Sequence, residues 1–238
     1  MRLVIGSTVV VALALAISPA IQARQGGAQE GPSKAIAGGG IHAPGWMGKI
    51  DANEEKAGLT IDSAKLVAEG DKLHVTTGPA TTYWNPKNVA SGDYTVKATF
   101  LEPDFMGLND HPHPYGIVIG GNDLGTDNQS YLYCAAYGNG SYIVRGMGPA
   151  PFAMGGRRAT PSDAVHKAEA QHKPVTQEIA MQVKGDSVSC IINGTTVATY
   201  PKSELVMAGK LKSTDGVYGI RFAHNTDGTV SNLKVTKP

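Results

Sequence analysis

The sequence predicts an all-β fold, an antiparallel two-sheet jelly-roll sandwich of the concanavalin A-like kind with little helix. Three observations predict it: short segments alternate apolar and polar residues, glycine- and asparagine-rich turns separate them, and helical patterns are scarce. Strict alternation is typical of a strand that buries one face. Short strands at regular spacing with such turns indicate a sandwich or a barrel.

Residues 1–23 have the pattern of a secretory signal peptide. Met1-Arg2 precedes an apolar run from Leu3 to Ile17, and small residues follow where a signal peptidase would cut. The run is shorter than the roughly 20 apolar residues that a spanning helix needs. We therefore expect a periplasmic or extracellular protein without a membrane span after cleavage, an uncleaved anchor being the alternative.

Residues 24–45 are rich in Gly, Pro, Ala and Gln, and we expect them to form a flexible linker. Residues 46–238 then suit one jelly-roll domain, since single β domains of 200–250 residues are common. With 21 basic and 20 acidic residues, the chain has a formal net charge of +1. A near-neutral chain without a basic stripe argues against nucleic acid as a partner.

The strands that we expect follow one another through this domain. Their segments are residues 94–100, 115–121, 129–137, 141–147, 179–183, 187–192, 195–200, 218–222 and 233–235. Asn193-Gly194 is the strongest hairpin signal, because both residues tolerate positive φ. Gly138-Asn139-Gly140 and Gly185-Asp186 indicate two more turns. A short helix is expected at 163–170 and a single helical turn at 202–206.

Several of these segments resemble the concanavalin A-like lectin/glucanase superfamily, and most closely its laminin-G-like and 3-keto-disaccharide hydrolase-like domains. The resemblance is carried by Trp46 and residues 93–100, 115–121, 183–186, 192–194, 219–222 and 230–233. It implies the fold and a carbohydrate-facing surface on the open face of a curved sheet. These motifs are structural, so they do not imply an activity.

Two cysteines, Cys134 and Cys190, make one disulfide plausible in an exported chain. The alternative is two buried thiols that pack as small hydrophobic groups. If both cysteines point inward, the alternation directs Tyr131, Tyr133 and Tyr137 outward together. Such a platform would stack on sugar rings. The opposite orientation, with the tyrosines in the core, is the alternative because aromatic side chains are usually buried.

Trp84 and Arg145 are further ligand-binding candidates. The Trp84 indole ends an expected strand, where it could stack on a sugar, and the Arg145 guanidinium could donate paired hydrogen bonds to hydroxyls or a carboxylate. Each residue fits packing or an ordinary surface charge equally well.

His111 and His113 form an H-x-H pair with acidic neighbours. Such a pair could bind zinc or copper, but metal sites need three or four converging ligands and the sequence identifies no third. We therefore interpret the segment as a stiff loop at the rim of the sandwich. For an enzyme, His111, His113, Asp104 and Asp123 are the candidate acid/base groups.

Four oxygen-bearing residues occur close together in one expected loop: Asn122, Asp123, Asp127 and Asn128. Oxygen ligands at this spacing fit a structural calcium ion, which the resembling superfamily often carries. The same residues are ordinary turn formers, and that simpler interpretation is preferred. We expect no other cofactor.

Glycoside hydrolysis by the usual route needs two carboxylates, and the glucanase branch places them at alternate positions of one strand. That motif is absent, since the nearest sequence, Glu102-Pro103-Asp104, has a proline between its acids. We therefore expect an exported, lectin-like carbohydrate-binding domain. The alternatives are a glycoside hydrolase-like enzyme of the 3-keto-disaccharide hydrolase type and a cell-envelope interaction protein that uses the insertion 149–174.

Overall fold

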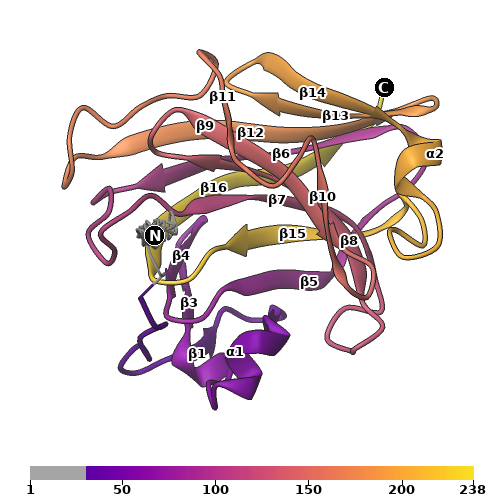
Figure 1. Ribbon diagram of the computed structural model, residues 1–238. Coiled ribbons are helices and arrows are strands. Elements are labelled where there is room, and N and C mark those ends of the chain that lie inside the picture. Colours follow the sequence, from indigo (N-terminus) through magenta and orange to yellow (C-terminus); the bar gives the residue numbers. More distant parts are fainter. Residues whose placement is uncertain (1–30) are drawn as a thin grey trace, which may run out of the picture. The chain divides into compact units, whose positions relative to one another are not determined.

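The computed structural model describes residues 31–238, and two stacked β-sheets form a sandwich that is not a closed barrel (Figure 1). The predicted jelly-roll-like sandwich with little helix is thus confirmed. The predicted signal peptide lies outside the described residues. Among the residues described, no helix is both long and apolar enough to cross a membrane.

Sheet A holds eight strands. In spatial order these are β1 (Gly40–His42), β3 (Lys65–Glu69), β4 (Lys72–Thr77), β16 (Thr226–Thr236), β6 (Tyr94–Glu102), β12 (Val175–Lys184), β13 (Ser187–Ile192) and β14 (Thr195–Pro201). The β1–β3 pair is parallel and the other pairs are antiparallel.

Sheet B packs against sheet A and is antiparallel throughout. Its order is β10 (Pro151–Met154), β9 (Ser141–Met147), β8 (Ser130–Tyr137), β7 (Pro114–Asn122), β15 (Gly216–Phe222), β5 (Thr81–Ala90) and β2 (Met47–Ile50), and β11 (Thr160–Pro161) also pairs with β9.

The helical elements are α1 (Ala52–Lys56), a 3-10 turn (Ile61–Ser63) and α2 (Lys202–Leu205). The turn expected at 202–206 is confirmed as α2. The helix expected at 163–170 is wrong, because tertiary contacts hold this segment in turns. Val165 is buried in the core, and the His166 backbone N–H donates to Gln177 Oε1 at 3.0 Å.

The predicted linker 24–45 is also too long. Residues 24–30 lie outside the described part of the chain, but β1 falls inside the predicted range and pairs with β3. Backbone bonds from Ile36 N to Ser63 O and from Gly40 N to Ala64 O add to this pairing. The composition of this segment was misleading, because backbone hydrogen bonds can order a segment that buries little apolar surface.

The core between the sheets consists of the inward-pointing side chains of both. Phe100 of β6, Tyr115 of β7 and Phe222 of β15 pack their rings with centroids 5.7–6.0 Å apart. Cys134 of β8 and Cys190 of β13 form a disulfide across the core. The bridge and the inward direction of both cysteines are therefore confirmed, and the bridge ties sheet A to sheet B.

The hairpin predicted at Asn193-Gly194 joins β13 to β14. Both residues have positive φ, 48° and 81°, as a type I′ turn requires. The turns at 138–140 and 185–186 likewise join β8 to β9 and β12 to β13, as predicted.

Candidate functional site

The outer face of sheet B carries the predicted tyrosines. Tyr131 and Tyr133 lie on the side of β8 opposite the inward-pointing Cys134, and they belong to a second apolar cluster separate from the main core. The orientation predicted from the alternation is thus confirmed.

The tyrosines are nevertheless less accessible than an open platform requires. Tyr131 is 1% exposed and Tyr133 is 9% exposed, whereas Tyr137 is half-buried. Apolar neighbours explain this: the cluster also contains Val118, Ala135, Ile143, Leu124, Met147 and Ala159. The expectation of three freely exposed rings is therefore corrected.

Arg221 of β15 is the central polar residue of this face. Its Nη1 donates to Asp51 Oδ1 at 2.9 Å, to Thr82 Oγ1 at 2.8 Å and to Tyr131 Oη at 3.2 Å, and its Nη2 donates to Asp51 Oδ2 at 2.5 Å. The guanidinium carbon lies 5.1 Å from the centroid of the Tyr133 ring. Such a position favours a cation–π interaction.

The Arg221 side chain is only 10% exposed, so its charge needs compensation. Burial alone would lower the pKa of Arg221, but the Asp51 carboxylate more than offsets this and raises it further. Burial also raises the pKa of the Tyr131 phenol, which therefore stays neutral. Arg221 was not among the predicted ligand-binding residues. The available signal was a lone charge at an outward position between Ile220 and Phe222.

Three of the predicted ligand residues lie in one row across sheet B. The strand register aligns Trp84 with Gly219, Val118, Tyr133 and Arg145. Four strand spacings separate the ends of this row, which is roughly 19 Å.

The two ends of the row differ in exposure and contacts. The Trp84 side chain is 3% exposed. Arg145 is half-buried, and its Nη2 donates to the Arg157 carbonyl at 2.7 Å. The buried Nε of Arg145 has no hydrogen-bond partner among the described residues.

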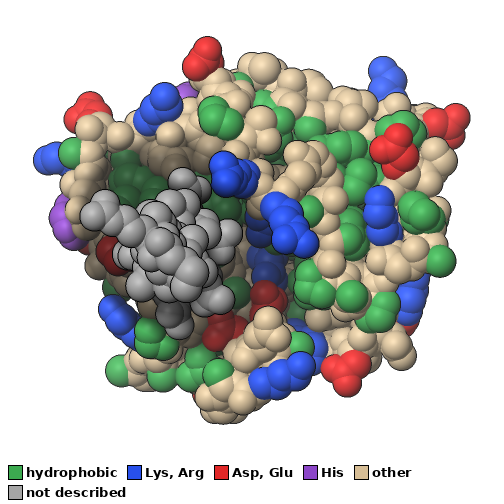
Figure 2. All heavy atoms as spheres, in the orientation of Figure 1, with side chains coloured by type: hydrophobic (Ala, Val, Ile, Leu, Met, Phe, Trp, Pro, Cys, Tyr) green, Lys and Arg blue, Asp and Glu red, His purple; other side chains and the backbone are tan. Residues whose placement is uncertain are grey.

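Acidic residues are absent from all eight strands of sheet B, namely β2, β5, β7, β8, β9, β10, β11 and β15. Both carboxylate oxygens of Asp51, beside the sheet, already accept hydrogen bonds from Arg221. In the space-filling view, basic and acidic side chains lie side by side in a recess of the face shown, with hydrophobic side chains around them (Figure 2). The strands of this sheet therefore offer no pair of carboxylates for glycoside hydrolysis.

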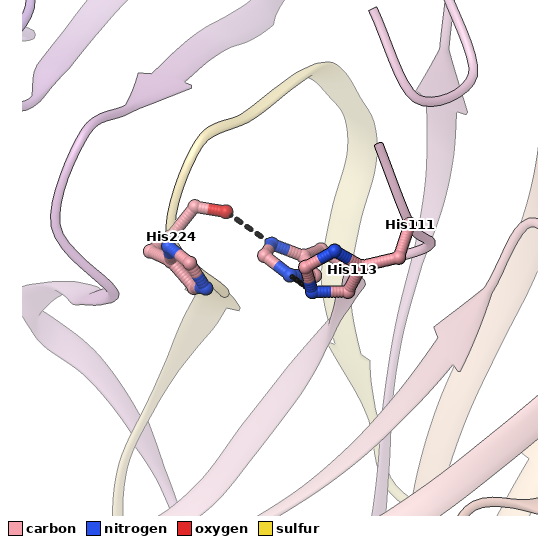
Figure 3. Close-up of side chains that lie close together, drawn as sticks. All are labelled: His111, His113 and His224. Carbon is pink, nitrogen blue, oxygen red and sulfur yellow. Dashed lines mark hydrogen bonds between the residues drawn. The ribbon is translucent and has the colours of Figure 1, made fainter. Parts of the chain in front are cut away.

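A second cluster lies at one end of the sandwich and contains His111, His113 and His224 (Figure 3). The β6–β7 loop supplies the first two and the β15–β16 connection supplies the third. Strand pairing brings them together, because Phe222 pairs with Tyr115 and the Ala223 N–H donates to the Pro114 carbonyl at 2.9 Å. His224 was not among the predicted site residues, and 111 residues separate it from His113.

The three rings are close enough to share one ligand. One ring nitrogen from each lies within 4.8 Å of the others. The centroid of His113 is 4.4 Å from that of His111 and 4.1 Å from that of His224. A small polar cavity beside His111 and His113 is also lined by Glu102, Asp104 and Asp227.

Glu102 was not among the predicted acid/base groups. It ends β6 with the inward orientation of Phe100 and is 4% exposed. Burial raises its pKa to about 7, although a hydrogen bond from the Met106 N–H acts in the opposite direction. The sequence signal was an acid at an inward position of an alternating strand.

The other predicted acid/base residues do not form one group. Asp104 lines the same cavity but pairs with His172, with Oδ1 2.8 Å from Nδ1. Asp123 pairs with Lys212 at the far end of β7, roughly 30 Å along the strand from His113. One active site cannot contain both Asp123 and the histidines.

The four predicted calcium ligands make separate contacts. The Asn122 amide donates to the carbonyls of Gly120 and Asp215, and Asp123 pairs with Lys212. Asp127 lies 3.8 Å from Lys49 Nζ, and the Asn128 N–H donates to Thr126 Oγ1. These contacts are those of a polar turn, and calcium binding stays a prediction.

Comparison with known proteins defines the fold. No family model and no curated protein matches the chain. Among solved structures it is similar to an endo-β-1,3-glucanase from Pyrococcus furiosus, with a TM-score of 0.55 and 12% identity over 84% of this chain and 91% of that one.

Two proteins from Bacillus subtilis are similar to nearly the same extent. The carbohydrate binding module CBM66 gives a TM-score of 0.53 and 11% identity over 83% of this chain and 99% of that one. A protein of unknown function with a galectin-like fold gives a TM-score of 0.53 and 13% identity over 88% of this chain and 97% of that one. The chain therefore shares the two-sheet sandwich fold of these structures, as the sequence resemblance predicted.

Proposed function

We propose that this chain is an exported carbohydrate-binding domain that holds a glycan on the outer face of sheet B. The observation that carries the proposal is Arg221, a nearly buried charge on the outside of a sheet. Its guanidinium is fixed by Asp51, Thr82 and Tyr131, and it lies against the Tyr133 ring. A surface that served only solubility would not need a charge held in this way.

The chemistry of the face suits a sugar. The half-buried Tyr137 and the edge of Tyr133 provide apolar contact for the C–H side of a pyranose, and a guanidinium group donates to its hydroxyls. Arg145 adds a second, half-buried guanidinium next to Tyr133 in the same row. Because hydrogen bonds already fix side chains such as Arg221 on this face, less conformational entropy is lost on binding.

Binding is favoured over glucanase-type hydrolysis because the strands of sheet B contain no carboxylate. Retaining and inverting glycosidases both place two carboxyl groups around the scissile bond. Asp51 is the carboxylate bound to Arg221, and its charge is already neutralised. The similarity to a carbohydrate binding module supports the same choice, and the disulfide supports an oxidising location.

Affinity electrophoresis of the full chain tests the proposal. Gels would contain neutral or acidic polysaccharides of plant, algal and bacterial origin. We expect at least one polysaccharide to retard the protein. We expect Arg145→Ala to lower the affinity for that polysaccharide at least about tenfold, because the variant loses one charged hydrogen-bond donor.

The matched control is Lys97→Ala, which removes one positive charge from the outer face of sheet A. It should retain the retardation of the parent protein. Thermal melting would show that both variants are folded. Absence of retardation in every gel, or equal loss in Arg145→Ala and Lys97→Ala, would contradict the proposal.

A further inference from the structure

We propose that His111, His113 and His224 form a binding site for a divalent transition metal ion, with zinc as the best match. The site is independent of the glycan-binding face, because it lies where β7 begins and β15 ends. Three residues from two distant loops supply the converging ligands that the sequence could not identify.

Hydrogen bonds fix which nitrogen of His113 can bind a cation. Its Nδ1 lies 2.5 Å from the His224 carbonyl oxygen and 2.7 Å from the Asn109 amide Nδ2. These contacts occupy the Nδ1 side of the ring, so Nε2, which faces His111, is the nitrogen that would bind a metal ion. The backbone of one histidine thus orients the ring of another.

The same reasoning applies to His111. Its Nδ1 lies 2.6 Å from Asp110 Oδ1, and a carboxylate can only accept. Nδ1 of His111 therefore donates to Asp110, and its lone pair is on Nε2.

The two Nε2 atoms lie 2.8 Å apart. Two opposed lone pairs would repel each other at this distance, so either a proton on one ring or a metal ion must join the two nitrogens. Two nitrogens bound tetrahedrally to one zinc ion at about 2.1 Å are about 3.4 Å apart. The pair needs to open by only about half an ångström to bind the metal, and His224 supplies the third ring.

The surroundings match those of known histidine–metal sites. A ligating histidine usually donates its second N–H to a carboxylate or a backbone carbonyl, and both kinds of partner occur here. Neutral imidazoles suit zinc, copper, nickel and iron better than calcium or magnesium. Three protein ligands leave a coordination position for water or a ligand oxygen, and the polar cavity adjoins the site.

Calorimetric titration of the untagged, chelator-treated full chain with ZnCl₂ tests the proposal. We expect one equivalent of Zn²⁺ to bind. We expect His111→Ala and His224→Ala each to lower the affinity at least about 100-fold, more than the loss of an outer-shell partner. Co²⁺ should give the visible absorption of a site with nitrogen ligands, and this band should vanish in both variants.

The matched control is His42→Ala, since His42 is exposed and its ring contacts the Gly39 carbonyl. It should bind Zn²⁺ like the parent. Asp110→Ala, at a 94% exposed side chain, tests the orienting bond without disturbing packing and should cost about 10- to 100-fold.

Two results would overturn the proposal: no saturable Zn²⁺ binding by the folded full chain, or equal affinity in the His42, His111 and His224 variants. The first would mean that a shared proton holds the His111–His113 pair. Neither result would affect the glycan-binding test, which uses a different face and different residues.

Discussion

The outer faces of the two sheets differ in how deeply their side chains are buried. On β6 of sheet A, burial alternates strictly, and the outward residues include Lys97 and Thr99. On β8 of sheet B, seven consecutive residues from Ser130 to Ala136 are buried. Sheet A therefore turns an ordinary polar face to water, whereas sheet B buries side chains on both faces.

This difference teaches that loss of alternation in an antiparallel sandwich can mark the face with specialised contacts. Antiparallel sheets commonly leave one face solvated, so a second buried face needs a reason. On sheet B the second face surrounds Arg221 and its partner Asp51.

The largest effect is expected on the inner side, at the disulfide. Replacing Cys134 and Cys190 by Ala removes a bridge between residues 56 positions apart. Because the bridge restricts the unfolded chain, we expect a loss of roughly 4 kcal/mol in the free energy of unfolding. Urea denaturation checks this, with the reduced parent protein as control. A loss below about 1 kcal/mol would show that the sheets do not depend on the bridge.

Arg221→Met should give the next largest loss, about 3 kcal/mol, because it leaves the Asp51 carboxylate without its partner. Asp51 keeps 29% of its side chain exposed, so water will compensate part of this cost. Chemical denaturation again measures the change. If the double variant Arg221→Met/Asp51→Leu is no more stable than Arg221→Met, the ion pair does not stabilise this face as described.

Glu102→Gln tests the one acid that the alternation of β6 places inside. Its pKa is raised to about 7, so the folded protein keeps this proton over a pH range where the unfolded chain has lost it. Stability should therefore fall between about pH 4.5 and 7 through this group. We expect Glu102→Gln to gain roughly 2 kcal/mol at pH 8, since each pKa unit corresponds to about 1.4 kcal/mol.

The same variant should be neutral at pH 4, where the parent carboxyl is already protonated. Thermal melts of both proteins from pH 4 to 8 measure the difference. A constant difference over this range would mean that Glu102 titrates normally.

The smallest effect is expected on the outer face of sheet A. Lys97→Ala removes an ion pair with Glu178. The Lys97 side chain is 34% exposed and the Glu178 side chain is 45% exposed. Exposed pairs contribute little, so the loss should stay below about 0.5 kcal/mol. A loss comparable to that of Arg221→Met would remove the contrast between the two faces.

The strands, the turns and the inward direction of the cysteines could be predicted from the sequence, because period-2 alternation reports local orientation. The alternation does not indicate which side chains cover an outward face, and so Tyr131 and Tyr133 were expected to be exposed. It also does not predict which distant segments pair with each other. His224 reaches His113 only through the β7–β15 register, which no local pattern specifies.

The exposed connection between β10 and β11, which includes Arg157 and Arg158, lies in sequence between the two bridged cysteines. A trypsin-like protease that cleaves there would produce two polypeptides that remain covalently joined. Such a nicked molecule would migrate as one species until a reductant is added. This surface loop could therefore be cut in a protease-rich environment without releasing either half of the protein.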